Sequence, residues 1–185
     1  LMFLYFDLKQ VDIAIIEAGI GGQLDSTNVL SPELVICTSI SFDHTETLGD
    51  SLIDIARHKA GVMRENTPIL LGRVSEEVSH LFKQKSQELQ APIANIDREI
   101  QLLSTDNQTL RVIYSDWESP NLNLPMLGKH QENNTGLAVT AAHLLTQRFP
   151  KITNQSIQDG ICDTHWPGRS EWIRNNIYLC LLYTS

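Results

Sequence analysis

Short apolar runs recur along the first half of the chain, and their composition predicts buried strands. The first two runs are rich in β-branched residues and show little polar alternation, as expected for strands that are covered on both faces of a sheet. The predicted strands are residues 11–17 (VDIAIIE), 34–40 (LVICTSI), 67–72 (TPILLG) and 91–96 (APIANI).

Segments with helical character separate these strands. Asp50-Ser51 supplies a cap for one helix, and Val78, Leu81 and Phe82 lie on one side of the next. Strand and helix therefore alternate, which predicts an α/β fold with a mostly parallel sheet flanked by helices. The predicted helices are residues 52–63, 75–90, 133–149 and 154–162.

The chain after residue 100 departs from this alternation. Residues 101–115 predict a small β-hairpin, because the turn formers Asp106 and Asn107 separate two short apolar runs. Residues 165–173 (HWPGRSEWI) have the character of an irregular boundary. The hairpin region is therefore expected to be an addition to the parallel sheet.

Composition limits the class of protein. The chain has 185 residues, of which 42% are hydrophobic and 19% charged, as is usual for one globular domain. No apolar run reaches the roughly 18–20 residues of a membrane span, and we see no secretory signal. The net charge of −8 argues against nucleic acid as a partner. Three cysteines without metal-ligand spacing favour free thiols in the cytoplasm.

The glycines do not complete a known phosphate-binding motif. Gly19, Gly21 and Gly22 follow the first predicted strand, but Leu24 stands where a dinucleotide fingerprint needs its third glycine. The only Gly-Lys pair is followed by His130, so it is not the end of a P-loop. Glycines at such a place still allow backbone to approach a ligand closely.

Polar side chains follow the first two predicted strands directly. Glu17 ends the first, and Asp43 and His44 follow the second, so parallel strands would place them at one edge of the sheet. An acid there can hold Mg²⁺, and a neutral imidazole can ligate a metal. A capping or salt-bridged acid and a turn with a hydrogen-bonded histidine are the alternatives.

Three further segments carry candidate chemistry. Lys59 lies among small residues in the first helix, where a buried ammonium near Mg²⁺ needs a carboxylate partner or conversion to an anionic carbamate. His130 and Asn134 can recognise a base edge, and Arg169 can bind phosphate. A solvated helix lysine, a linker and a turn are the respective alternatives.

Taken together, the chain resembles the folylpolyglutamate synthase/dihydrofolate synthase family of the Mur ligase superfamily. The resemblance runs from about residue 1 to about residue 178, and its first two blocks are highly specific. The matching stretches are VDIAIIEAGIGGQLDSTN, TSISFDHTETLG, IARHKAGV, LPMLGKHQENN and WPGR, in the order of the family.

The resemblance implies an ATP-dependent amide ligase. A substrate carboxylate attacks the γ-phosphate of ATP, and the amine of L-glutamate displaces phosphate from the resulting acyl phosphate. The implied cofactors are ATP and Mg²⁺, the latter at two sites. The implied substrates are dihydropteroate or folates. The resemblance also implies that the enzyme is a monomer in the cytoplasm. The implied magnesium ligands, also taken as catalytic, are Glu17, His44 and a carbamylated Lys59.

The remaining implied roles concern nucleotide and folate. Asn134 matches the adenine-contacting position, with His130 beside it, and Arg169 matches the position that reaches ATP phosphate. The substrate side of the cleft is implied to consist of Gly21, Gly22, Asp25, Thr27, Asn28 and Asp43.

The resemblance also implies an arrangement of domains. Residues 1–168 would be the central, ATP-binding domain with a P-loop-like fold, but without its N-terminal P-loop, and residues 169–185 an interdomain linker with an aberrant end (CLLYTS). Gln23 stands where the family has Arg. We therefore expect this chain alone to be inactive.

Three alternatives remain open. One is a non-catalytic nucleotide- or folate-binding remnant, and another is a Mur-type ligase that acts on a UDP-linked peptidoglycan precursor. The third is a nicotinamide-dependent oxidoreductase, against which the missing third glycine weighs.

Overall fold

The parallel sheet predicted from the apolar runs is present in the computed structural model, which describes residues 1–105, 108–126, 128–167, 171–174 and 177–179. Three strands pair in parallel in the order β1-β2-β3. They are β1 (Val35–Ser39), β2 (Ile69–Arg73) and β3 (Ile93–Asn95), and they confirm the predicted strands at 34–40, 67–72 and 91–96.

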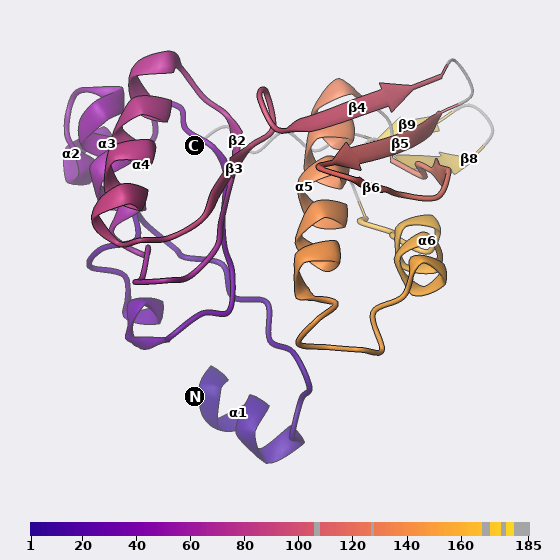
Figure 1. Cartoon of the computed structure of the whole chain (residues 1–185), viewed down its shortest axis with the longest axis horizontal. Coiled ribbons are helices and arrows are strands. Elements are labelled where there is room, and N and C mark those ends of the chain that lie inside the picture. The colour runs from indigo at the N-terminus through magenta and orange to yellow at the C-terminus, as the bar shows by residue number, and fades with distance from the viewer. Residues whose placement is uncertain (106–107, 127, 168–170, 175–176, 180–185) are drawn as a thin grey trace.

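Helices cover both faces of this sheet (Figure 1). One face carries α3 (Leu52–Ala60) and α4 (Glu76–Glu88), and the other carries α5 (Lys129–Leu145). The Ser51 hydroxyl accepts a hydrogen bond from Asp54 N at 3.1 Å, which confirms the cap predicted from Asp50-Ser51. The short helix α2 (Thr45–Leu48) precedes α3.

Strand β2 supplies side chains to two hydrophobic cores. Leu70 points toward α5, whereas Ile69 and Leu71 point toward α3 and α4, because successive strand residues face opposite sides. All three are buried. This alternation joins the two helical layers through one strand.

A second, antiparallel sheet lies beyond α5. It contains β4 (Ile100–Ser104), β5 (Thr109–Tyr114), β6 (Trp117–Glu118) and β7 (Leu122–Asn123). The β4–β5 pairing confirms the predicted hairpin; its turn at Asp106 and Asn107 lies outside the described residues. The Cβ of any larger residue at Gly136 would meet Leu102 Cδ2 at 2.6 Å, so this glycine lets α5 approach the sheet.

The helices of the second half differ little from the expected ones. α5 begins four positions before the predicted residue 133, and α6 (Asn154–Cys162) has the predicted bounds. Residues 165–173 are not irregular throughout, because β8 (Glu171–Arg174) pairs with β9 (Ile177–Leu179). The proposed boundary at residue 168 and the tail from residue 180 lie outside the described residues.

The strand predicted at residues 11–17 is wrong. Within the described residues this segment has no regular secondary structure and pairs with no strand, and the described sheet ends at β1. Val11, Ile13 and Ile15 are 42%, 43% and 93% exposed. An apolar run becomes a strand only where a neighbour satisfies its backbone donors and acceptors, and here none does.

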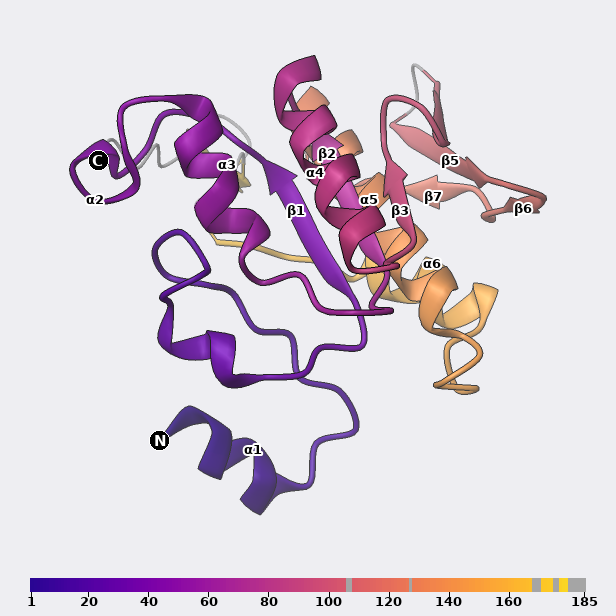
Figure 2. The same ribbon diagram turned by 60° about the vertical axis from the view of Figure 1, so that its left-hand side comes forward.

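The N-terminal helix also stands apart from the two sheets. α1 (Met2–Lys9) has no buried residue, and it lies at the outer end of the molecule in both views (Figures 1 and 2). Leu4, Tyr5 and Leu8 are among its exposed apolar side chains. None of the described helices is long and apolar enough to cross a bilayer.

Candidate functional site

A single carboxylate shapes the loop formed by residues 19–28. Asp25 Oδ2 accepts hydrogen bonds from Gly19 N at 2.8 Å and Ile20 N at 3.2 Å. Its Oδ1 accepts from Thr27 N at 2.8 Å and Thr27 Oγ1 at 2.6 Å. The Thr27 hydroxyl and these backbone amides lower the pKa of Asp25 to about 2. Asp25 is therefore a carboxylate that closes the loop on itself.

The loop caps the last turn of α3. Gln23 N donates to His58 O at 2.8 Å, which satisfies a carbonyl at the end of the helix. Three glycines permit this contact. A Cβ on Gly61 would lie 2.4 Å from Gln23 Cβ, one on Gly22 2.7 Å from Val62 Cγ1, and one on Gly21 2.7 Å from Leu48 Cδ2. The glycines that we expected to leave room for a ligand thus leave room for α2 and α3.

Asn28 and Arg64 fasten the other end of the loop. Asn28 Nδ2 donates to Gln23 O at 2.9 Å and to Gly61 O at 3.3 Å. Arg64 Nη2 donates to Asn28 O and to Asn28 Oδ1, both at 2.7 Å. The side chain of Asn28, like that of Asp25, is engaged within the protein.

Lys59 lies in the same last turn of α3. A Cβ on Gly22 would lie 3.3 Å from Lys59 O, so the loop backbone passes close to this residue. Burial raises the pKa of the Cys37 thiol to about 11, while the nearby Lys59 ammonium acts in the opposite direction. Lys59 is half-buried, and within the described residues it forms no ion pair.

Asp43 and His44 lie at the start of α2. His44 is the N-cap residue, with a left-handed backbone (φ 49°), and its Nε2 lies 3.6 Å from Asp43 Oδ2. Both side chains are about half exposed. Since Leu48 of α2 reaches Gly21, the structure brings this short helix to the loop and to α3.

Glu17 is exposed and lies two positions before the first residue of the loop, Gly19. It does not end a strand, so the predicted edge formed by two neighbouring parallel strands is absent from the described structure. In this part of the chain no group of three His, Cys, Asp or Glu side chains is placed to hold a metal ion. An exposed carboxylate such as that of Glu17 fits Mg²⁺ that is bound chiefly by phosphates, with one or two protein carboxylates.

The residues expected to bind the nucleobase form a separate group at the start of α5, across the sheet from α3. A Cβ on Gly128 would lie 2.7 Å from His130 Cε1, so the imidazole lies against the N-cap. Asn134 Nδ2 donates to Gln131 Oε1 at 3.3 Å. Arg169 lies outside the described residues.

Two residues of this site were missed from the sequence. Arg64 has no motif around it, and only its position three residues after Gly61 relates it to the loop. Asn133 Oδ1 is buried, and no described donor reaches it. The amides of Gln131, Asn133 and Asn134 were the available signal, but the sequence does not show which of them faces inward.

Comparison with known proteins identifies the class to which this fold and site belong. The chain belongs to the Mur ligase middle domain family, whose model matches residues 1–142.

Its relatives within that class are enzymes of folate metabolism. It is 31% identical to folylpolyglutamate synthase of Lacticaseibacillus casei, over 91% of this chain and 41% of the relative. It is 30% identical to dihydrofolate synthase/folylpolyglutamate synthase of Bacillus subtilis, over 96% of this chain and 43% of the relative. A solved FPGS–AMPPCP–folate complex superimposes with a TM-score of 0.87 at 30% identity, over 95% of this chain and 44% of the other. The chain therefore spans less than half the length of these relatives.

Proposed function

We propose that the chain is the nucleotide-binding part of an ATP-dependent ligase that adds L-glutamate to dihydropteroate, to folates or to both. The observation that carries this proposal is the close superposition, over nearly the whole chain, on a complex that holds both an ATP analogue and folate. The loop at 19–28, α2 and the end of α3 form the side of the site that we assign to folate and the acyl phosphate.

The proposed reaction has two steps. A carboxylate oxygen of the folate attacks the γ-phosphorus of ATP, and the bond to ADP breaks to leave an acyl phosphate and ADP. The glutamate amine then attacks the acyl carbon, and the tetrahedral intermediate expels phosphate while the nitrogen loses a proton. Mg²⁺, when bound, supplies neutralisation of phosphate charge. Glu17 and His44 are the ligands that we assign to it.

Carbamylation of Lys59 is part of this proposal. An ammonium would repel Mg²⁺, and none of the described carboxylates pairs with Lys59. Carbamylation would replace the positive charge by an anionic oxygen ligand. Lys59 is half-buried, and the loop backbone at Gly22 passes close to its carbonyl oxygen.

The start of α5 is the part that we assign to the nucleobase. His130 and Asn134 offer hydrogen-bonding groups there, and Asn133 Oδ1 is a buried acceptor without a described donor. Arg169 is assigned to ATP phosphate on its sequence motif. We place the protein in the cytoplasm, a compartment that keeps thiols such as those of Cys37 and Cys162 free. We also propose that it is a monomer, which rests on the resemblance alone.

A second candidate function applies to the chain by itself. It spans 41% of the L. casei relative, so that part of what the relative contributes lies outside these 185 residues. Binding of nucleotide or folate without turnover is therefore the second candidate function.

Glutamate ligation by the full-length gene product tests the ligase proposal. Glu17→Gln should lower ATP-dependent incorporation of glutamate into dihydropteroate by about 100-fold or more, as expected when electrostatic stabilisation of the transition state is lost. Asp12→Asn, which removes another exposed carboxylate of the same segment, should leave the rate unchanged. Equal rates for the Glu17 variant and the wild type would remove Glu17 from the site.

A further inference from the structure

Arg64 makes the densest set of hydrogen bonds to the 19–28 loop from outside it. Its Nη2 donates to both oxygens of Asn28 at 2.7 Å. Its Nη1 donates to Gly61 O at 3.2 Å and Met63 O at 3.1 Å. One guanidinium therefore joins the end of the loop to the turn that follows α3.

The partners of Arg64 are themselves tied to the loop. Asn28 N donates to Asp25 O at 2.9 Å, and Asn28 Nδ2 reaches Gln23 O and Gly61 O. Gly61 O thus accepts from both Arg64 and Asn28. The contacts form a closed circuit from the loop through the guanidinium to the turn and back. A shift of Arg64 would leave Asn28 joined to the turn only by its own hydrogen bond to Gly61 O, at 3.3 Å.

The geometry requires a guanidinium. Its planar fork directs two nitrogens at four acceptors at once, whereas an ammonium is a single point with fewer fixed directions. Arg64 and Asn28 are both half-buried, and hydrogen bonds from a charged donor are stronger than neutral ones. Lysine at this position would retain the positive charge but only some of the four hydrogen bonds.

The hydrogen bonds of the loop change the role of the residues expected to bind substrate. Asp25, Thr27 and Asn28 direct their polar side-chain atoms at one another and at nearby backbone. What the loop offers to a ligand is therefore its overall shape, its exposed apolar side chains, Ile20 and Leu24, and the exposed polar side chains of Gln23 and Ser26. That shape depends on what holds the loop against α3.

We propose that Arg64 is a positioning residue that fixes the 19–28 loop in its ligand-binding conformation, through Asn28 and the turn after α3. The ligand-facing part of this proposal rests on the proposed function, in which the loop contacts the folate. The Arg64 circuit itself rests only on the hydrogen bonds described here.

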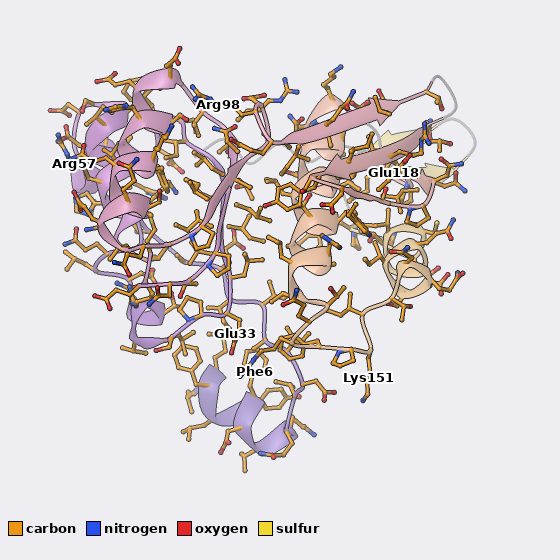
Figure 3. All side chains as sticks on the ribbon, in the orientation of Figure 1. Phe6, Glu33, Arg57, Arg98, Glu118 and Lys151 are labelled. Carbon is orange, nitrogen blue, oxygen red and sulfur yellow. The ribbon has the colours of Figure 1, made fainter. Side chains whose placement is uncertain are left out.

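The test compares Arg64→Met and Arg64→Lys with the control Arg57→Met in the purified chain. Arg57 points outward from α3 (Figure 3) and pairs with Asp54 at 3.0 Å. Amide hydrogen exchange of Thr27 and Asn28 should be about tenfold faster in Arg64→Met, intermediate in Arg64→Lys and unchanged in Arg57→Met. Exchange of Leu70 and Leu71 in β2 should stay as in the wild type in all three variants.

Calorimetry with two ligands separates positioning from general damage. Folate should bind about tenfold more weakly to Arg64→Met, and the ATP analogue AMPPCP with Mg²⁺ should bind equally to all variants. Unchanged exchange in the loop, faster exchange in β2, or a parallel loss of both ligands would each overturn the proposal. If the wild type binds neither ligand, the proposed function fails for this chain, while loop exchange still decides the role of Arg64.

Discussion

Asp25 shows how one side chain determines the conformation of a functional loop. Both of its oxygens accept two hydrogen bonds, from donors that come before and after it in the chain. These bonds favour the charged form, which is why the pKa of the carboxyl is lowered. The order of the loop is thus linked to the charge of one residue.

Acid should loosen the loop at a pH well below the ordinary titration of an aspartate. A depressed pKa in the folded state means that the contribution of Asp25 is fully present above its ordinary value of 3.8 and is lost as pH falls through about 2. The amide resonances of Gly19 and Thr27 should therefore shift with a midpoint near the lower value. Asp25→Asn should abolish this transition; a midpoint at 3.8 in the wild type would contradict the prediction.

The sequence singled out these residues without showing how they interact. Asp25, Thr27 and Asn28 were expected at a substrate, and that role stays a prediction. Residue types alone do not show which backbone donors come within reach, so the mutual bonding of the three was not foreseen. Arg64 was missed because its four acceptors come from segments that are distant or featureless in sequence.

At the scale of helices and strands, the sequence predicted correctly those elements that pack against other strands and helices of this chain. β2 was foreseen from its apolar run, and it lies between two strands and two helical layers. The run at 11–17 is just as apolar, but it has no described neighbour. The apolar pattern of a segment indicates that it can form a strand. Whether it does depends on a second strand that pairs with it, and the segment's own sequence does not show that partner.

The contact between the loop and α3 can be tested with two glycine substitutions. Gly61→Ala should destabilise the chain by about 1–3 kcal/mol, because its Cβ would overlap Gln23 and separate the loop from His58 O. Gly61 has φ −64°, which alanine adopts readily, so the effect is steric. Urea denaturation measures it.

The matched control for that measurement is Gly160→Ala in α6. Nothing lies within 4 Å of a Cβ there, so alanine should stabilise the helix by about 0.5–1 kcal/mol. Equal effects of the two substitutions would mean that the loop does not pack against α3 in solution.

At the scale of the whole molecule, the two cores share β2 and are therefore expected to unfold together. One core fills the space between the sheet, α3 and α4, and the other the space between the sheet, α5 and the antiparallel strands. Adjacent residues of one strand enter different cores, so loss of either core exposes the backbone that supports the other.

Leu70→Ala and Leu71→Ala test this coupling. Each removes a fully buried side chain and should cost about 2–5 kcal/mol. We expect a single urea transition in both variants, at a lower midpoint, with far-UV and near-UV circular dichroism coinciding. Two separated transitions, or a change confined to one probe, would show that the cores are independent.

The exposed N-terminal segment has a consequence for how the protein behaves at high concentration. Leu1, Leu8 and Ile15 carry large apolar surfaces into solvent, while the chain as a whole bears a net charge of −8. Like charge keeps molecules apart only over a Debye length, about 10 Å at 0.1 M salt and shorter in more concentrated salt. Added salt would therefore weaken the repulsion between molecules, and the exposed apolar side chains could then associate. We expect the chain to aggregate least at low ionic strength.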